Sequence, residues 1–200
     1  MEECEHHRRH RRKKGWLICV CVTIAIIILL LILYFAAYKP KDPSVQMPYI
    51  SMTSYNVGTT APSFSAITFG LNLQVSIYNP NKGDFQLENT STASLQYGAA
   101  WVGASLFPSS NVIPSQSAIS LAVHVDLQRP LTVNLTATDT NVGNYLPLPI
   151  SSLVNVIGHS TSVGMFSIHS NVLLLCNIDV GLGKATASII SFACGKSYSA

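Results

Sequence analysis

From residue 67 onward, hydrophobic and polar side chains alternate with a period of two, which is typical of half-buried β-strands. The clearest example is ITFGLNLQVSIY, a segment that begins at Ile67 and ends at Tyr78. Its hydrophobic face would comprise Ile67, Phe69, Leu71, Leu73, Val75 and Ile77. A dense turn signal, NPNKGD, follows at residues 79–84. The pattern predicts a long strand with one face against a core.

Further segments also show the composition and alternation of strands. We predict strands at residues 93–97, 99–106, 117–127, 163–179 and 185–192. In residues 117–127 the inward set would be Ile119, Leu121, Val123, Val125 and Leu127. The segment at 163–179 is long for one strand, so we expect a bend near residues 169–171. Residues 181–184 read as a hairpin turn into the last strand.

Residues 129–144 are ambiguous, because their hydrophobic side chains are spaced as in a helix but their threonines have low helix propensity. We predict a short helix there, in a connection that crosses one end of the domain. Several strands with turn signals between them and at most one helix indicate a mainly β fold. The predicted architecture is a two-sheet antiparallel sandwich.

Residues 16–38 form a stretch of 23 residues without charge, proline or glycine. A helix of about 20 apolar residues matches the hydrocarbon core of a bilayer, so we predict an uncleaved transmembrane helix here. A buried core helix or a cleaved signal peptide fits less well, because the apolar run is too long. Six basic residues precede it: Arg8, Arg9, Arg11, Arg12, Lys13 and Lys14. Positive charge favours the cytosolic side, so the C-terminal domain would be extracellular.

These patterns divide the chain into four parts. They are a disordered basic cytosolic tail (1–15), the transmembrane helix (16–38), a Pro-containing stalk (39–66) and the β-sandwich domain (67–200), with a first edge strand starting near Tyr49. Residues 45–200 carry four basic and five acidic side chains, so the net basic charge belongs to the N-terminal region. The tail is expected to contact anionic lipid headgroups. We expect no nucleic-acid partner.

The five cysteines fall into two groups. Cys176 and Cys194 lie in the predicted exterior domain, where an oxidising compartment favours a disulfide. Two buried free thiols are the alternative. Cys4 and Cys19 are accessible to acylation from the cytosol, although Cys19 and Cys21 fit equally well as small apolar residues of the helix.

Groups that carry catalysis are sparse. Charged residues make up 10% of the chain, and it contains no nucleophile elbow, zinc-protease or phosphate-loop motif. We therefore predict no enzyme activity, no cofactor and no metal site. His124 and Asp126 share one strand face and could begin a metal site, but no third ligand is evident. We interpret them, like Asp84 and Glu88, as solvated polar residues.

Two kinds of motif carry a mechanism. Asn89-Thr90-Ser91 and Asn134-Leu135-Thr136 are N-glycosylation sequons, which predict glycans on Asn89 and Asn134 if the domain lies outside the cytosol. The turn tripeptide Lys82, Gly83 and Asp84 is similar to adhesion tripeptides and is a candidate contact for a protein or cell-wall partner. A plain turn is the alternative, since glycine and aspartate are favoured in turns.

The order of these features resembles the plant NDR/HIN-like proteins, which carry a late embryogenesis abundant group 2 domain. The matching residues are the strand running into Asn79-Pro80-Asn81, then Leu95-Gln96-Tyr97, the turn region at Gly103 and the C-terminal Cys176 and Cys194. The resemblance covers about residues 16–198. The chain departs from the family pattern at residues 83–86, where members commonly have tyrosines.

The resemblance implies an immunoglobulin- or fibronectin-like sandwich of about seven strands plus a helix. It also implies association with the plasma membrane and a role in defence or stress response. The expected function is a membrane-anchored, non-enzymatic interaction protein. The alternative is a structural or lipid-handling stress protein at the membrane surface. Self-association through an exposed sheet edge is also open.

Overall fold

The computed structural model describes residue 16 and residues 19–34, 41–61, 64–108, 111–133, 146–162, 166–183, 186–195 and 198–199. The chain divides into two compact units, Met1–Lys39 and Pro40–Ala200. The basic cluster at residues 8–14, Cys4 and Asn134 lie outside the described residues.

The first unit contributes one described helix, over residues 19–34, whose large hydrophobic side chains are exposed. Its 16 residues rise about 24 Å at 1.5 Å per residue, less than the roughly 30 Å of a bilayer core. Among the described residues, no helix combines the length and the apolar character needed to cross a membrane. The transmembrane helix predicted over residues 16–38 is therefore wrong for the part of the chain that the structure describes, because the described helix is shorter than the about 20 residues that a span requires.

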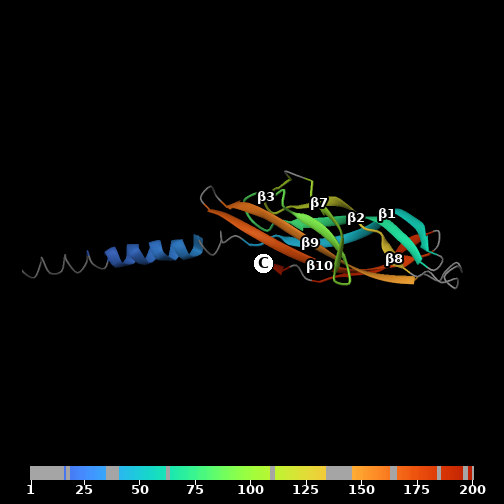
Figure 1. The fold of residues 1–200 in the computed structure, drawn as a ribbon. Coiled ribbons are helices and arrows are strands. Elements are labelled where there is room, and N and C mark those ends of the chain that lie inside the picture. Colours follow the sequence, from blue (N-terminus) through green and yellow to red (C-terminus); the bar gives the residue numbers. More distant parts are fainter. Residues whose placement is uncertain are drawn as a thin grey trace, which may run out of the picture. The chain divides into compact units, whose positions relative to one another are not determined.

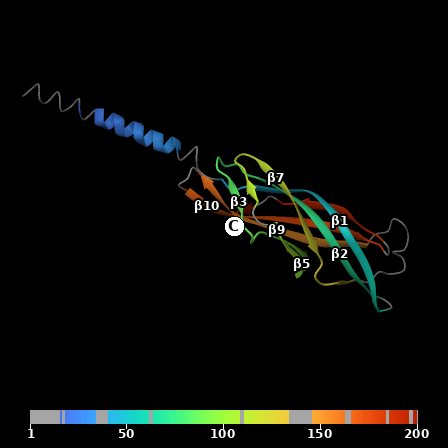
Figure 2. The same cartoon turned by 90° about the horizontal axis from the view of Figure 1, so that it is seen from above.

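The second unit consists of two antiparallel sheets, and the prediction of a mainly β, two-sheet fold is confirmed (Figure 1). The four-stranded sheet contains β1 (Ser44–Ala61), β2 (Phe64–Tyr78), β7 (Ala118–Asp126) and β8 (Leu131–Val133). Its order is β1-β2-β7, and β8 also pairs with β2. Seen from above, β1 and β2 pass over β9 and β10 of the other sheet (Figure 2).

The eight-stranded sheet holds the remaining strands. They are β3 (Phe85–Leu87), β4 (Thr92–Tyr97), β5 (Ala100–Leu106), β6 (Val112–Ile113), β9 (Leu146–Ser162), β10 (Phe166–Leu182), β11 (Ala187–Cys194) and β12 (Tyr198–Ser199). The main order is β11-β10-β9-β3-β6, and β4 joins β9 to β5. The predicted strands at residues 93–97, 99–106, 117–127 and 185–192 correspond to β4, β5, β7 and β11.

The core lies between the two sheets and is built from alternate residues of the long strands. The six inward residues predicted for β2 are all at most 2% exposed. Val123 and Val125 of β7 and Leu127 just after it are buried as predicted, whereas Ile119 and Leu121 of β7 are only partly buried. The alternation read from the sequence therefore gave the correct face of both strands.

Residues 44–61 lie within the predicted stalk, but they form β1, so the edge strand expected near Tyr49 is present and already starts at Ser44. Val45, Met47 and Ile50 are buried in the core. Pro48 lies at a register shift between Gln46 and Tyr49, where its missing N–H does not interrupt the ladder. The prolines that suggested a stalk are thus compatible with an edge strand.

β9 was not predicted from the sequence, because its inward positions include Ser152, Gly158 and Ser160 and so lack continuous hydrophobic alternation. β10 pairs with β9 in unbroken register from Phe166 to Leu182, so the predicted bend near residues 169–171 is absent. The predicted helix at 129–144 begins instead with the strand β8, and residues 134–144 lie outside the described part.

Candidate functional site

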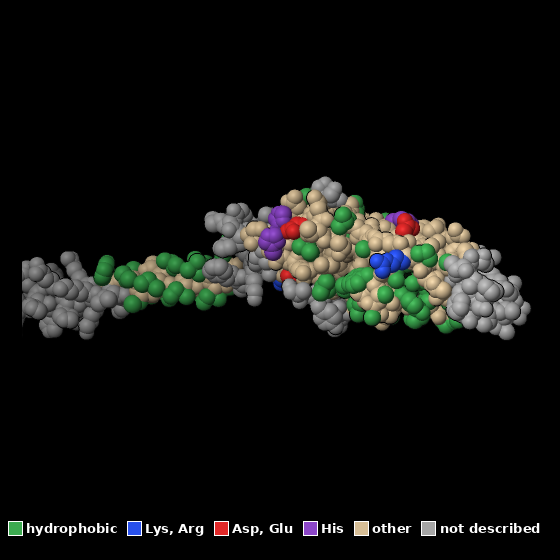
Figure 3. Space-filling view, viewed as in Figure 1, with side chains coloured by type: hydrophobic (Ala, Val, Ile, Leu, Met, Phe, Trp, Pro, Cys, Tyr) green, Lys and Arg blue, Asp and Glu red, His purple; other side chains and the backbone are tan. Residues whose placement is uncertain are grey.

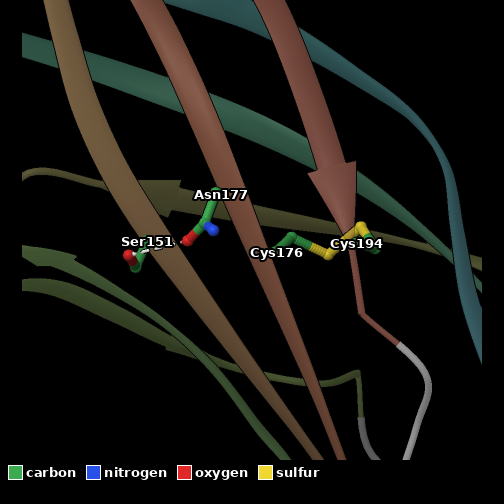
Figure 4. The surroundings of a disulfide bond; sticks show 4 residues. All are labelled: Ser151, Cys176, Asn177 and Cys194. Carbon is green, nitrogen blue, oxygen red and sulfur yellow. Dashed lines mark hydrogen bonds between the residues drawn. A yellow bond between two sulfur atoms is a disulfide. The ribbon is translucent and has the colours of Figure 1, made fainter.

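The disulfide between Cys176 and Cys194 is present, with the two Cα atoms 4.0 Å apart (Figure 4). The two residues face each other across β10 and β11, and the side chain of Cys176 is fully buried. The bond fastens β11, a strand at the edge of the eight-stranded sheet, to the interior strand β10. The paired interpretation of these cysteines is therefore confirmed. Cys19 and Cys21 are exposed free cysteines.

The sequon at Asn89 has two distinct parts in the structure. Asn89 is exposed in the turn between β3 and β4, where an oligosaccharide can be accommodated. Ser91 is fully buried, and its hydroxyl donates to Ile157 O at 2.9 Å and accepts from Ile157 N at 3.0 Å. The hydroxyl of this sequon therefore also holds the turn against β9.

The candidate adhesion turn is firmly held. Lys82 and Asp84 are exposed, and Gly83 is half-buried. Ser115 N donates to Asp84 Oδ1 at 3.2 Å, and Asn79 Nδ2 donates to Gly83 O at 2.8 Å. Gly83 does not have a positive φ, so its conformation is one that other residues can also adopt. The tripeptide is accessible at its two charged ends.

His124 and Asp126 lie together on the outer face of the four-stranded sheet, half or more exposed as the sequence predicted. His124 Nε2 is 3.1 Å from Asp126 Oδ1, and its Nδ1 is 3.3 Å from the hydroxyl of Thr53 on β1. A Cβ on Gly70 would collide with the Asp126 carboxylate and the Thr53 hydroxyl, so this glycine makes room for the cluster. The position of Thr53 beside His124 could not be predicted from the sequence, because it results from the pairing of β1, β2 and β7.

A second polar cluster joins Glu88 to two histidines of the β9–β10 hairpin. Glu88 Oε1 is 3.0 Å from His169 Nδ1 and 3.8 Å from His159 Nδ1, and the two rings are 6.0 Å apart. His159 and His169 are direct partners in the register. Figure 3 shows histidine beside acidic side chains at two places on the β unit. Among the described residues, no group of three such side chains could hold a metal ion.

The outer face of the eight-stranded sheet carries exposed hydrophobic side chains, which no motif had indicated. Trp101 and Leu106 on β5 are 54% and 63% exposed, and Leu175 on β10 is 48% exposed. Leu175 on β10 pairs with the half-buried Leu153 on β9. The next outward residue of β10 is Leu173. Figure 3 shows exposed hydrophobic side chains gathered on the β unit. A clustered, exposed apolar surface of this kind marks a site of interaction.

The same face contains unpaired polar atoms. Asn155 and Asn171 point outward from β9 and β10, and their Oδ1 atoms are buried without a hydrogen-bond partner. Thr92 of β4 pairs with both Asn155 and Leu106, so these residues adjoin the hydrophobic ones. The face thus combines exposed apolar side chains with two amide oxygens that are buried and unpaired in the described part of the chain.

This face brings together residues from four strands, β4 and β5 from one part of the sequence and β9 and β10 from another. Periodicity indicates which residues of a strand share a face, but it does not indicate which strands are neighbours. Trp101 and Leu175 could therefore not be assigned to one surface from the sequence. The chain matches no protein-family model and no curated protein sequence.

Proposed function

We propose that this protein is a non-enzymatic interaction module whose β-sandwich acts outside the cytosol, at the cell surface, in a defence or stress response. The observation that carries the proposal is the exposed hydrophobic surface formed by Trp101, Leu106 and Leu175. The resemblance to the NDR/HIN-like proteins supports the biological setting.

The outer face of an antiparallel sheet in a sandwich is ordinarily polar, because it faces water. Three large apolar side chains, each about half exposed or more, depart from that rule on β5 and β10, two strands of one sheet with β4 and β9 between them. Covering them with a partner removes apolar area from water, which stabilises a complex by roughly 25 cal/mol per Å² before the costs of association. The surface is therefore suited to recognition.

The compartment is supported by the covalent chemistry of the domain. The Cys176–Cys194 disulfide is of the kind that persists in oxidising compartments and is rare in the cytosol. Asn89 is an exposed glycan acceptor in a sequon. Both features favour a domain that faces the lumen of the secretory pathway and then the cell exterior.

The test uses the full chain expressed in plant cells and cross-linked at the cell surface with a membrane-impermeant photoreactive reagent, which captures proteins and polysaccharides alike. We expect adducts with the wild-type chain and their loss in a Leu106→Asp, Leu175→Asp double variant. Tyr49→Asp is the matched control, because Tyr49 is 57% exposed but lies on β1 of the other sheet.

Endoglycosidase treatment should remove mass from the wild-type chain, and Asn89→Gln should reduce that loss of mass. Adducts that persist in the double variant would contradict the assigned surface. A chain with reduced cysteines and no glycan would contradict the compartment.

A further inference from the structure

We propose that the outer face of the eight-stranded sheet binds a neutral polysaccharide along one row of side chains, which we name the glycan strip. The strip consists of Trp101, Gln96, Ser151, Asn177 and Ala193, one residue from each of five adjacent strands. The inference rests on the proposed function and gives its partner a chemical class.

The register places these five residues side by side. Trp101 on β5 is opposite Gln96 on β4, which is opposite Ser151 on β9. Ser151 is opposite Asn177 on β10, which is opposite Ala193 on β11. At about 4.8 Å between strands, the four steps span about 19 Å, enough for several sugar rings in a row.

The strip faces away from the core. The preceding or following residues of the three central strands, Leu95, Ser152 and Cys176, are fully buried. Successive side chains of a strand point to opposite faces, so Gln96, Ser151 and Asn177 point outward. Trp101 is 54% exposed, and Asn177 and Ala193 are also exposed.

The polar groups of the strip are arranged as hydrogen-bonding partners for hydroxyls. Ser151 Oγ donates to Asn177 Oδ1 at 3.2 Å, which orients the amide so that Nδ2 remains as a donor (Figure 4). The Gln96 amide and the indole N–H of Trp101 make no hydrogen bond to any residue in the described part of the chain. Three neighbouring donors are thus available to one ligand.

The rows on either side of the strip differ in character. On one side lie Ala104, Ser94, Leu153 and Leu175, which are mostly apolar. On the other lie Pro149, Asp179 and Ser191, where Ser191 Oγ donates to Asp179 Oδ2 at 2.7 Å. A sugar chain has apolar C–H faces and polar hydroxyl edges, so it matches an aromatic ring and an apolar row beside a row of amides.

Charge decides which polysaccharides fit. Of the residues in the strip and its two bordering rows, Asp179 alone is charged, and it is negative. An acidic polysaccharide would be repelled by it and would find no cation in these rows. The strip therefore favours a neutral glycan.

The experiment titrates the purified, disulfide-bonded full chain with cellohexaose, xylohexaose and hexagalacturonate. The chain has two tryptophans, so a Trp16→Phe background leaves Trp101 as the sole indole reporter. We expect a saturable change in Trp101 fluorescence with at least one neutral hexasaccharide. Hexagalacturonate should bind at least about tenfold more weakly, a difference of about 1.4 kcal/mol.

Variants then assign the binding to the strip, with calorimetry as the readout and denaturant unfolding as the check on folding. Trp101→Ala and the Gln96→Ala, Asn177→Ala double variant should each lose at least about tenfold in affinity, and Trp101→Phe should keep part of it. Tyr49→Ala, an exposed aromatic on the other sheet, should bind as the wild type does.

No binding of either neutral hexasaccharide, or equal losses in Trp101→Ala and Tyr49→Ala, would overturn the glycan proposal. If cross-linked protein adducts still depend on Leu106 and Leu175 in that case, the partner is a protein and the interaction function stands. If Cys176 and Cys194 are reduced in cells and Asn89 carries no N-linked glycan, the proposed function fails independently of these titrations.

Discussion

The side-chain amide of Asn81 pairs with the backbone of Lys41 as a neighbouring strand would. Lys41 N donates to Asn81 Oδ1 at 2.6 Å, and Asn81 Nδ2 donates to Lys41 O at 2.7 Å. Asn79, fully buried two residues earlier, donates from Nδ2 to Gly83 O, Ile113 O and Pro114 O. Its Oδ1 accepts from Asn81 N at 3.0 Å. The Asn79-Pro80-Asn81 turn therefore joins the end of β2 to the start of β1 and to the loop after β6.

Asn79→Ala should destabilise the domain by about 3 kcal/mol, because three backbone carbonyls lose their donor in a buried site. Asn81→Ala should cost about 1–2 kcal/mol, since its partner Lys41 is nearer to solvent. Denaturant unfolding measures both changes. Asn56→Ala, an exposed position on β1, is the control and should stay within about 0.5 kcal/mol of wild type. Equal stability of Asn79→Ala and Asn56→Ala would contradict the role of this turn.

Loss of the disulfide should lower the free energy of unfolding by about 3 kcal/mol, because a link between residues 18 apart restricts the unfolded chain. We expect a Cys176→Ala, Cys194→Ala variant to match the reduced wild-type chain in denaturant unfolding and to be insensitive to reductant. A Cys19→Ser, Cys21→Ser variant is the control and should keep the sensitivity of the wild type. A reductant effect that persists without Cys176 and Cys194 would show that the stabilisation arises elsewhere.

Gly158 allows β3 to lie close beside β9, its neighbour in the sheet. A Cβ at this position would collide with the Phe85 ring and lie 2.5 Å from Gln86 O, a backbone atom that cannot move aside easily. Gly158→Ala should therefore cost about 2–3 kcal/mol in denaturant unfolding. Gly58→Ala is the matched control, because a Cβ on that strand glycine would meet only Ala66 O at 3.8 Å. Similar stabilities for the two variants would rule out this close contact.

Tyr55 makes stability depend on pH in the alkaline range. Its hydroxyl donates to Gly183 O at 2.5 Å, and burial raises the pKa of this phenol above 10.0. A group whose pKa is raised by folding contributes its stabilisation fully below the unfolded value, and that contribution is lost as pH rises through the folded value.

Between pH 8 and 11, we therefore expect the advantage of wild type over Tyr55→Phe, about 1 kcal/mol, to persist up to about pH 10 and to shrink above it. Urea unfolding of both proteins across this range is the measurement. The Tyr55→Phe protein is also the control, because it contains every other group that titrates in this range. A constant difference in the free energy of unfolding between the two proteins at all pH values would contradict the assignment.

Some of the fold is encoded locally and could be predicted. The alternation of β2 fixed its inward face, because strand geometry alone decides which residues share a side. Turn residues located the loop after β2 in the same way. Cys176 and Cys194 could be proposed as a pair, although only the register of β10 and β11 places them opposite each other.

Other features needed the tertiary structure. The prolines of residues 39–66 indicated a stalk, but β1 forms because β2 supplies a ladder that tolerates a proline at a register shift. The inward serines and glycine of β9 break its hydrophobic alternation, so this strand could not be predicted from the sequence. It is stabilised by pairing with β10 on one side and with β3 and β4 on the other. The apolar composition of residues 16–38 did not reveal that the described helix is too short to span a membrane.

The candidate binding surface shows the same division. The sequence by itself placed Trp101, Gln96 and Asn177 in predicted strands, at residues 99–106, 93–97 and 163–179, whereas the strand of Ser151 was not predicted. Only the pairing of β5, β4, β9 and β10 decided that these side chains form one outward row. Neighbouring strands are chosen by hydrogen bonds and packing between segments distant in the chain, and local periodicity contains no information about that choice.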